Sequence, residues 1–195
     1  MDTPTVLQNF RNHGFVVSYF ETGEEAAGHI SSQLKGEVIG FGGSVTTQQL
    51  GLYDLLGKNN TVYWHWKNPQ DKARYGEFTV YICSANAVSE TGELVNIDGS
   101  GNRIASTIFG PKKLYYVIGT NKLVPDLAAA IERAQQVSAP KNAVRQKSKT
   151  PCAKDGVCHD CNSPARLCLG MFIAMRPMRS FEKTEIVFIN QELGY

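Results

Sequence analysis

The chain has 195 residues, 42% of them hydrophobic, and its 20 Lys and Arg against 18 Asp and Glu give a formal net charge of +2. This length suits one domain that buries enough apolar surface to fold without a metal or a disulfide. The near balance of charge argues against a dedicated nucleic-acid-binding protein, which usually has a strongly basic face.

The first 20 residues mix charged and apolar side chains and contain no continuous apolar stretch of the kind found in signal peptides. No apolar run approaches the roughly 20 residues needed to cross a bilayer. We therefore expect a cytoplasmic protein without a membrane span. In that reducing compartment, clustered cysteines bind metals more often than they form disulfides.

Short apolar runs alternate with amphipathic segments along the chain. Helices are predicted over residues 3–13, 22–34, 46–56 and 125–137, and strands over 15–20, 37–41, 61–66, 78–83, 114–118, 172–175 and 185–189, with a hairpin over 87–98. Thr22 and Glu25 have the spacing of a capping box. This alternation predicts an α/β fold of three layers, in which a mostly parallel sheet carries helices on both faces.

We expect a single domain over residues 1–195, with an α/β core at 1–139 and returning terminal strands at 169–195. Between them lie a basic linker at 140–151 and a cysteine loop at 152–168. The linker contains Lys141, Arg145, Lys147 and Lys149. A solvated connector is the simplest interpretation, and an anion-binding or partner-binding strip is the alternative.

A glycine-rich turn follows the predicted strand at 37–41. Gly42, Gly43, Ser44 and Thr46 lead from that strand into a helix. Glycines allow close approach of backbone N–H groups to a ligand, so the turn is a candidate site for a phosphate or carboxylate. It lacks the lysine of a phosphate-binding P-loop and the third glycine of a dinucleotide fingerprint. An ordinary tight turn with helix capping is the alternative.

A second polar segment, residues 84–103, leaves the predicted strand at 78–83. Ligands of open parallel sheets bind at the carboxyl ends of the strands, so this segment is placed for recognition or chemistry. Its candidate ligand-binding residues are Asn86, Asn96, Asp98, Gly99, Gly101, Asn102 and Arg103. The alternative is that these Asn, Asp and Gly residues only form turns.

Four of the five cysteines fall in one window. Cys152, Cys158, Cys161 and Cys168 have the spacing C-x5-C-x2-C-x6-C, with Gly, Asn, Ser and Pro residues that supply turns between them. Four thiolates suit either an iron–sulfur cluster or a tetrahedral zinc ion. Cys83 ends an apolar strand and is expected to be buried packing.

Three strings of the sequence carry a resemblance. Residues 40–46 (GFGGSVT), residues 84–103, and Gly110-Pro111 followed by residues 117–122 (VIGTNK) resemble the lactate-utilization (LUD, DUF162) domain family over nearly the whole chain. The cysteine-bearing ending is similar to the shorter LUD proteins of anaerobic bacteria. The run Tyr63-Trp64-His65-Trp66 is not part of the resemblance and is expected to shape a different pocket wall.

The resemblance implies a fold like the NagB/RpiA/CoA-transferase superfamily, whose members hold sugar phosphates, CoA thioesters or related ligands at loops equivalent to the two glycine segments. It also implies a role in oxidation of lactate to pyruvate beside iron–sulfur redox partner proteins. In the CoA-transferase relatives a Glu in this general region is the nucleophile, and Glu90 and Glu93 are the nearby candidates.

Three functions remain open at this stage. The first is a component of lactate or related hydroxy-acid oxidation that binds a small carboxylate, phosphate or CoA-like anion, with an iron–sulfur cluster at the cysteine loop. The second is an isomerase or acyl-transferase that uses Glu90, Glu93 or Asp98 as base or nucleophile. The third is a non-catalytic ligand-binding module with structural zinc. The sequence contains no complete set of nucleophile, base and orienting group that would decide between them.

Overall fold

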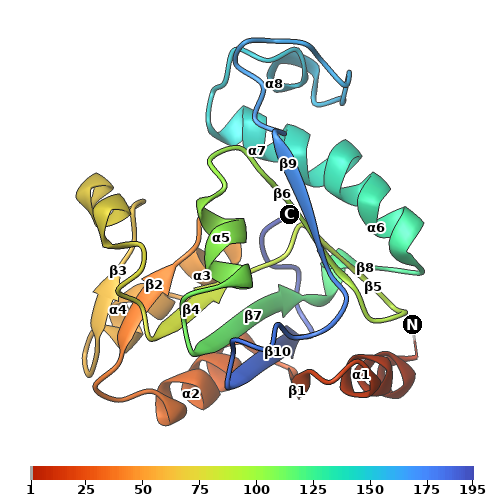
Figure 1. Cartoon of the computed structure of the whole chain (residues 1–195). Coiled ribbons are helices and arrows are strands. Elements are labelled where there is room, and N and C mark those ends of the chain that lie inside the picture. Colours follow the sequence, from red (N-terminus) through yellow and green to blue (C-terminus); the bar gives the residue numbers. More distant parts are fainter. Residues whose placement is uncertain (1) are drawn as a thin grey trace.

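The computed structural model describes residues 2–195, which form two sheets and the helices that cover them (Figure 1). The larger sheet has six strands in the order β1-β10-β7-β4-β2-β3, and every neighbouring pair in it is parallel. Its strands are β1 (Val16–Phe20), β10 (Lys183–Ile189), β7 (Lys113–Gly119), β4 (Val80–Cys83), β2 (Val38–Phe41) and β3 (Thr61–Tyr63). The predicted α/β class with a mostly parallel sheet is confirmed.

A smaller, mixed sheet of four strands lies beside the first, in the order β8-β5-β6-β9. Its strands are β5 (Ala87–Ser89), β6 (Leu94–Asp98), β8 (Leu123–Val124) and β9 (Gly170–Ala174). The antiparallel pair β5–β6 is the predicted hairpin, and β9 adds to it antiparallel to β6. The second sheet is a feature that the pattern of apolar runs did not predict.

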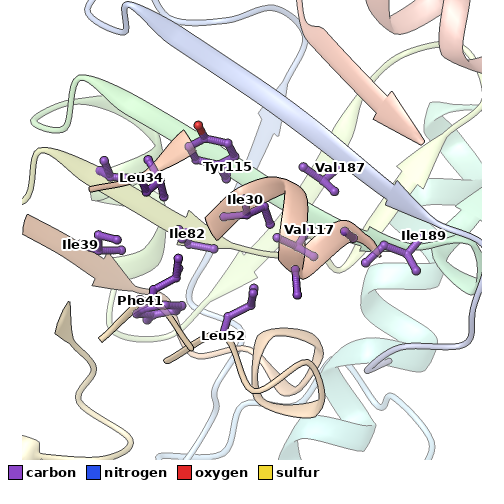
Figure 2. Close-up of a cluster of buried hydrophobic side chains, with 14 of the residues drawn as sticks. Ile30, Leu34, Ile39, Phe41, Leu52, Ile82, Tyr115, Val117, Val187 and Ile189 are labelled. Carbon is purple, nitrogen blue, oxygen red and sulfur yellow. The ribbon is translucent and has the colours of Figure 1, made fainter. Parts of the chain in front are cut away.

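Successive side chains of a strand point to opposite faces, and β7 shows how this builds two cores. Tyr115 and Val117 pack against α2 (Gly23–Gln33) and α4 (Leu52–Leu56), the cluster drawn in Figure 2. Leu114, Tyr116 and Ile118 belong to the opposite cluster, with α1 (Thr3–Asn12) and parts of the small sheet. The second face is therefore covered partly by the small sheet rather than by helices alone, and α6 (Leu127–Arg133) packs on that sheet.

Local signals set the helix boundaries. Thr22 and Glu25 form the predicted capping box at the start of α2. The helix predicted over 46–56 is instead two short helices, α3 (Val45–Gln49) and α4. Gly51, which has φ +61°, lies between them. A left-handed backbone conformation at this position stops α3 and starts α4 in a new direction.

The predicted strand at 61–66 is too long, because β3 ends at Tyr63. The chain then turns: the backbone N–H groups of Lys67 and Asn68 donate to the carbonyl oxygen of Trp64. The buried carboxylate of Asp71 accepts from the backbone N–H of Trp64 at 2.7 Å. The turn sends Trp64 into the core, where it is 2% exposed, and leaves Trp66 half-buried beside β2.

The predicted basic linker at 140–151 is also different in the structure. Ala139–Arg145 form α7, which continues α6 through a π-helical turn at Ala134–Ser138. Pro140 lies in the first turn of α7, directly after the π-helical turn. Ala143 is buried while Lys141 and Arg145 are exposed, so the first half of the predicted linker is a helix with one buried side.

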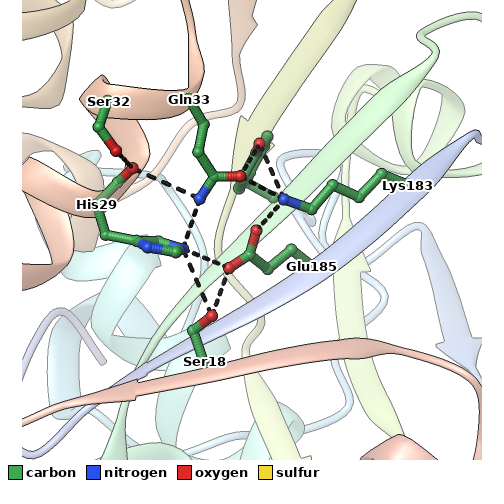
Figure 3. A network of polar contacts seen from close by, with 7 residues as sticks. Ser18, His29, Ser32, Gln33, Lys183 and Glu185 are labelled. Carbon is green, nitrogen blue, oxygen red and sulfur yellow. Dashed lines mark hydrogen bonds and ion pairs between the residues drawn. The ribbon is translucent and has the colours of Figure 1, made fainter.

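One polar network is built into the amino-terminal half of the large sheet (Figure 3). Glu185 on β10 is 1% exposed, and its Oε1 accepts from the Ser18 hydroxyl at 2.6 Å and lies 2.7 Å from His29 Nε2 on α2. Lys183 Nζ lies 2.6 Å from the other carboxylate oxygen. Burial alone would raise the pKa of Glu185, but the bonds from Lys183, Ser18 and His29 outweigh burial and hold the pKa below its ordinary value.

We predict that Glu185→Gln lowers the free energy of unfolding at pH 7 by about 1.5–3 kcal/mol, since it removes the charged acceptor of this network. A carboxylate with a lowered folded pKa stabilises the fold above its ordinary value of 4.5, and this contribution is lost as the pH falls through the lowered value. The difference between the two proteins in urea denaturation should therefore shrink below about pH 4.5.

Glu182→Gln is the matched control, because Glu182 is exposed and makes only a 3.5 Å pair with exposed Lys112. It should change stability by less than about 0.5 kcal/mol. Equal losses from the two substitutions would contradict the assigned role of Glu185.

Candidate functional site

A polar cavity of about 430 Å³ lies at the carboxyl edge of the six-stranded sheet. Residues that directly follow five of the six parallel strands line it: Ser44 and Thr46 after β2, His65 and Trp66 after β3, Ser84 and Asn86 after β4, Lys122 after β7, and Gly194 and Tyr195 after β10. This is the expected position for a ligand site in an open parallel sheet, and the volume suits a small organic ligand.

The charge of this cavity is one-sided. Its lining contains five cationic side chains, Lys72, Arg103, Lys122, Arg145 and Arg166, and a single carboxylate, Asp98. Positive groups gathered in a concave site attract and hold anions. The cavity is therefore suited to an anionic ligand, and it is called the anion pocket below.

Most of the residues predicted to bind a ligand lie in the anion pocket. Those that line it are Gly43, Ser44, Thr46, Asn86, Asp98, Gly99, Asn102 and Arg103. Gly42, Asn96 and Gly101 do not line it. The structure thus brings the two glycine segments together in one site, although they are about 50 residues apart in the sequence.

The first glycine turn owes its composition mainly to packing. A Cβ on Gly42 would lie 3.0 Å from Cys83 Cβ, and one on Gly43 would lie 3.0 Å from the ring of Trp66. Ser44 Oγ accepts from the backbone N–H of Thr47 and caps α3. The glycines therefore allow the turn to lie close against β4 and Trp66, and only Gly43 of the pair reaches the pocket.

The segment 84–103 is held by amide and guanidinium groups. Asn86 Oδ1 accepts from the backbone N–H of Ile97 at 2.7 Å and from Arg103 Nη2 at 3.1 Å. Buried Asn96 accepts from the backbone N–H of Asn86 at 3.2 Å. Asn96 therefore supports the pocket from behind, while Asn86 and Arg103 form part of its wall.

The three carboxylates predicted to be catalytic fall in different places. Asp98 lies in the pocket, but its Oδ1 accepts from Ser100 N and its Oδ2 from Arg103 N and Ile104 N. These bonds make Asp98 a cap for α5 (Asn102–Ile108). Glu90 and Glu93 lie outside the pocket, at the tip of the β5–β6 hairpin. There Glu93 accepts from Thr91 and Ser89, and the Glu90 carbonyl accepts from Asn9 of α1.

One wall of the pocket comes from the carboxyl-terminal residues and from α7. The Arg145 guanidinium lies 4.2 Å from the centre of the Trp66 ring, and its Nε donates to the Tyr195 hydroxyl at 2.8 Å. The sequence predicted a pocket wall at the run that contains Trp66, and it offered an anion-binding strip that contains Arg145 as an alternative to a solvated linker. In the structure Trp66 and Arg145 line the same pocket, and whether Arg145 binds an anion stays a prediction. Tyr195 was missed, because no local pattern shows where a chain end lies.

Lys122 is the pocket cation that is most deeply buried, with 2% exposure. Its ammonium group donates to Thr46 Oγ1 at 2.9 Å and to Ser84 Oγ at 2.8 Å. Burial lowers the pKa of Lys122 to about 7, and the nearby charges of Arg133 and Arg103 act in the same direction. The sequence analysis did not predict Lys122 as a site residue, because nothing in the sequence around a lysine that follows a strand shows that its side chain is buried.

The four clustered cysteines line a second cavity, of about 510 Å³, between the cysteine loop and α7. This cavity and the anion pocket share wall residues, including Arg166, Leu167 and Cys168. Burial raises the pKa of the Cys168 thiol, and the neighbouring sulfur atoms of Cys158, Cys152 and Cys161 act in the same direction. Cys83 is fully buried in the core, as predicted.

The donor set of the cysteine cavity fits a metal by its chemistry, because four thiols around one space are the ligands of zinc and of iron–sulfur clusters. The four thiols are not drawn together around one point, because among residues 2–195 no three His, Cys, Asp or Glu side chains converge as metal ligands do. Arg166 keeps the loop in shape by donating to the carbonyl oxygens of Cys168 at 2.9 Å and Cys161 at 2.8 Å.

A sequence model of the LUD domain matches residues 4–173, a stretch that includes both glycine segments and the cysteine loop. The chain belongs to the LUD domain family. The fold of this LUD protein is similar to the crystal structure of a DUF162 family protein from Deinococcus radiodurans. The two share 12% sequence identity and a TM-score of 0.55, over 97% of this chain and 99% of that chain. At this identity the likeness shows the fold alone. Among curated proteins, no relative matches.

No helix within residues 2–195 of this LUD protein is both long enough and apolar enough to cross a membrane.

Because Asp98 caps α5, its removal should destabilise the folded protein. We predict that Asp98→Ala lowers the free energy of unfolding by about 1 kcal/mol, the usual cost of a lost helix cap. Asp98→Asn keeps a side-chain oxygen for the backbone N–H groups and should lose less than half as much. Thermal denaturation followed by circular dichroism measures both variants. Equal destabilisation by the alanine and the asparagine would contradict a capping role.

Proposed function

We propose that this LUD protein binds a small carboxylate or phosphate anion in the anion pocket and acts in the oxidation of lactate or a related hydroxy acid. The observation that carries the proposal is the placement of three guanidinium groups and two lysine amines against one carboxylate at the carboxyl edge of a parallel sheet. Membership of the LUD domain family supports the metabolic context.

The ligand chemistry follows from the groups that face the pocket. Guanidinium groups such as those of Arg103 and Arg145 bind carboxylates and phosphates through paired hydrogen bonds. The hydroxyl groups of Ser44 and Ser84, which also line the pocket, can add hydrogen-bond donors. A hydroxy acid or its oxo acid presents one carboxylate and one neighbouring oxygen, so it matches this combination of cations and hydroxyls.

The pocket also agrees with the resemblance to the NagB/RpiA/CoA-transferase superfamily, in which phosphate- or CoA-bearing ligands lie at equivalent loops. An acyl transfer through Glu90 or Glu93 is not part of the proposal, because both carboxylates lie at the far tip of the β5–β6 hairpin. The proposed role of the pocket is ligand binding and orientation beside a redox centre.

That redox centre forms the second half of the proposal. Cys152, Cys158, Cys161 and Cys168 would hold an iron–sulfur cluster, in keeping with the resemblance of this ending to the shorter, cysteine-bearing LUD proteins. A cluster supplies one-electron transfer when it is bound. Its partners would be iron–sulfur redox proteins that exchange electrons with it. Zinc is the alternative occupant of the same thiols, and it would make the loop a structural element.

Anion binding can be followed through Trp66, one of two tryptophans in the chain and part of the pocket wall. We expect lactate, pyruvate or inorganic phosphate to change the tryptophan fluorescence of the protein with saturation at constant ionic strength. Arg145→Met should weaken the binding roughly tenfold or more, since it removes a charged donor worth about 1.5–3 kcal/mol.

Lys141→Met is the control for this loss, because Lys141 lies on the same helix α7 and is exposed but does not line the pocket. It should leave the affinity within about twofold, as expected of a distant exposed charge in salt. The proposal fails if none of the three anions binds, or if both substitutions weaken binding equally.

For the cysteine loop, we expect protein purified without oxygen and without a metal-affinity tag to contain iron and sulfide in equal amounts, with broad visible absorbance. The double substitution Cys158→Ser with Cys161→Ser should remove both. Cys83→Ala should retain them, because Cys83 lies in the core, away from the loop. A colourless protein with one zinc per chain would assign the loop a structural role, and four free thiols without metal would refute both occupants.

A further inference from the structure

Lys122 differs from the other cations of the anion pocket in its position and its partners. It follows the end of β7, and its side chain reaches Thr46, which follows β2, and Ser84, which follows β4. One amine thus joins the loops after three neighbouring strands at the base of the pocket. With 2% exposure, its access to solvent is limited to the pocket side.

The two hydroxyl partners define what the amine can do. Thr46 Oγ1 donates its own proton to the carbonyl oxygen of Leu193 at 3.2 Å, so it must accept a proton from Lys122. Ser84 Oγ accepts from Lys122 as well, and within residues 2–195 its own proton has no acceptor. A neutral amine that donates two protons in this way has only its lone pair left.

The charges around Lys122 favour the neutral amine. No carboxylate lies within ion-pair distance of Lys122 in the described residues. Besides burial, the guanidinium groups of Arg133 and Arg103 lower its pKa, and the thiol of Cys83 acts in the opposite direction. With its pKa lowered to about 7 by burial, a large share of Lys122 is unprotonated at neutral pH. Buried lysines without an acidic partner are suited to nucleophilic chemistry on carbonyl groups.

We propose that Lys122 Nζ is a nucleophile that forms an imine with the carbonyl carbon of a 2-oxo acid held in the anion pocket. This inference rests on the proposed function, because the pocket cations must first hold the carboxylate of the ligand. The carboxylate and the reactive carbonyl of a 2-oxo acid lie on adjacent carbons. The same small molecule can therefore contact a guanidinium group and the amine at the base of the pocket.

The step balances within the protein and its ligand. The nitrogen lone pair forms the C–N bond, and the π pair of the carbonyl moves to oxygen, toward the unused proton of Ser84. The resulting carbinolamine loses this oxygen as water, which carries away two protons supplied by the amine. The step needs no oxidant, reductant or metal.

Reductive trapping tests the proposal on the full-length protein. Pyruvate or glyoxylate is added at neutral pH, followed by sodium cyanoborohydride, which reduces an imine to a stable secondary amine. We expect one adduct per chain by mass spectrometry, placed on Lys122 by peptide mapping, with a yield at least tenfold above that of any other lysine. An excess of inorganic phosphate should suppress the adduct, because it competes for the same cations.

Two variants and one control make the result specific. Lys122→Met and Lys122→Arg should both lose the adduct, and the arginine variant keeps N–H donors for Thr46 and Ser84 if the methionine variant fails to fold. Lys112→Met should trap as much as the unmodified chain, because Lys112 is exposed and precedes the opposite end of β7.

The outcomes separate this inference from the proposed function. If fluorescence shows that the oxo acid binds but no adduct forms on Lys122, the imine is refuted and the anion pocket stands. An adduct that spreads over exposed lysines and persists in Lys122→Arg also refutes the imine. If no anion binds and no adduct forms, both proposals fall.

Discussion

The parallel direction of all six strands is the constraint on which the site depends. In a parallel sheet every strand ends at the same edge, so the loops that follow β2, β3, β4, β7 and β10 meet there. The strand order decides which loops become neighbours. β7 lies between β4 and β10, and its Tyr116 is paired with Cys83 on one side and Ile186 on the other. Lys122 can reach Ser84 and Thr46 only because these strands are neighbours.

Of the basic side chains that line the pocket, Arg166 is paired with a carboxylate, Asp160 at 2.8 Å, and the others make no ion pair within the described residues. Arg103 donates instead to the carbonyl oxygen of Ile97. Carbonyl oxygens fix a guanidinium group in place without cancelling its charge. The contrast is the opposite end of the sheet, where Glu185 is matched by Lys183 and His29. One end of the same sheet thus pairs its buried charges internally, and the other carries an excess of basic side chains.

The cysteine cavity is joined to this arrangement by a shared wall. Cys168, Leu167 and Arg166 contribute to both cavities, and the carbonyl oxygen of Leu167 lies against Gly99 so closely that a Cβ there would be 2.6 Å away. A ligand in the pocket and an occupant of the thiols would therefore be neighbours. Arg166 connects the two sites directly, because it donates to two carbonyl oxygens of the cysteine loop and also lines the pocket.

The sequence by itself determined the α/β class, most element positions, the Thr22 capping box and the two glycine segments, because these depend on periodicity and on neighbouring residues. It also placed four cysteines in one loop. Only the tertiary structure decided that Glu90 and Glu93 lie far from the pocket, that Asp98 caps a helix, and that Lys122, Arg145 and Tyr195 meet there. These facts depend on strand order and on contacts between residues far apart in the sequence. A local sequence pattern shows neither of them, and it also does not show whether a given lysine will be exposed or buried.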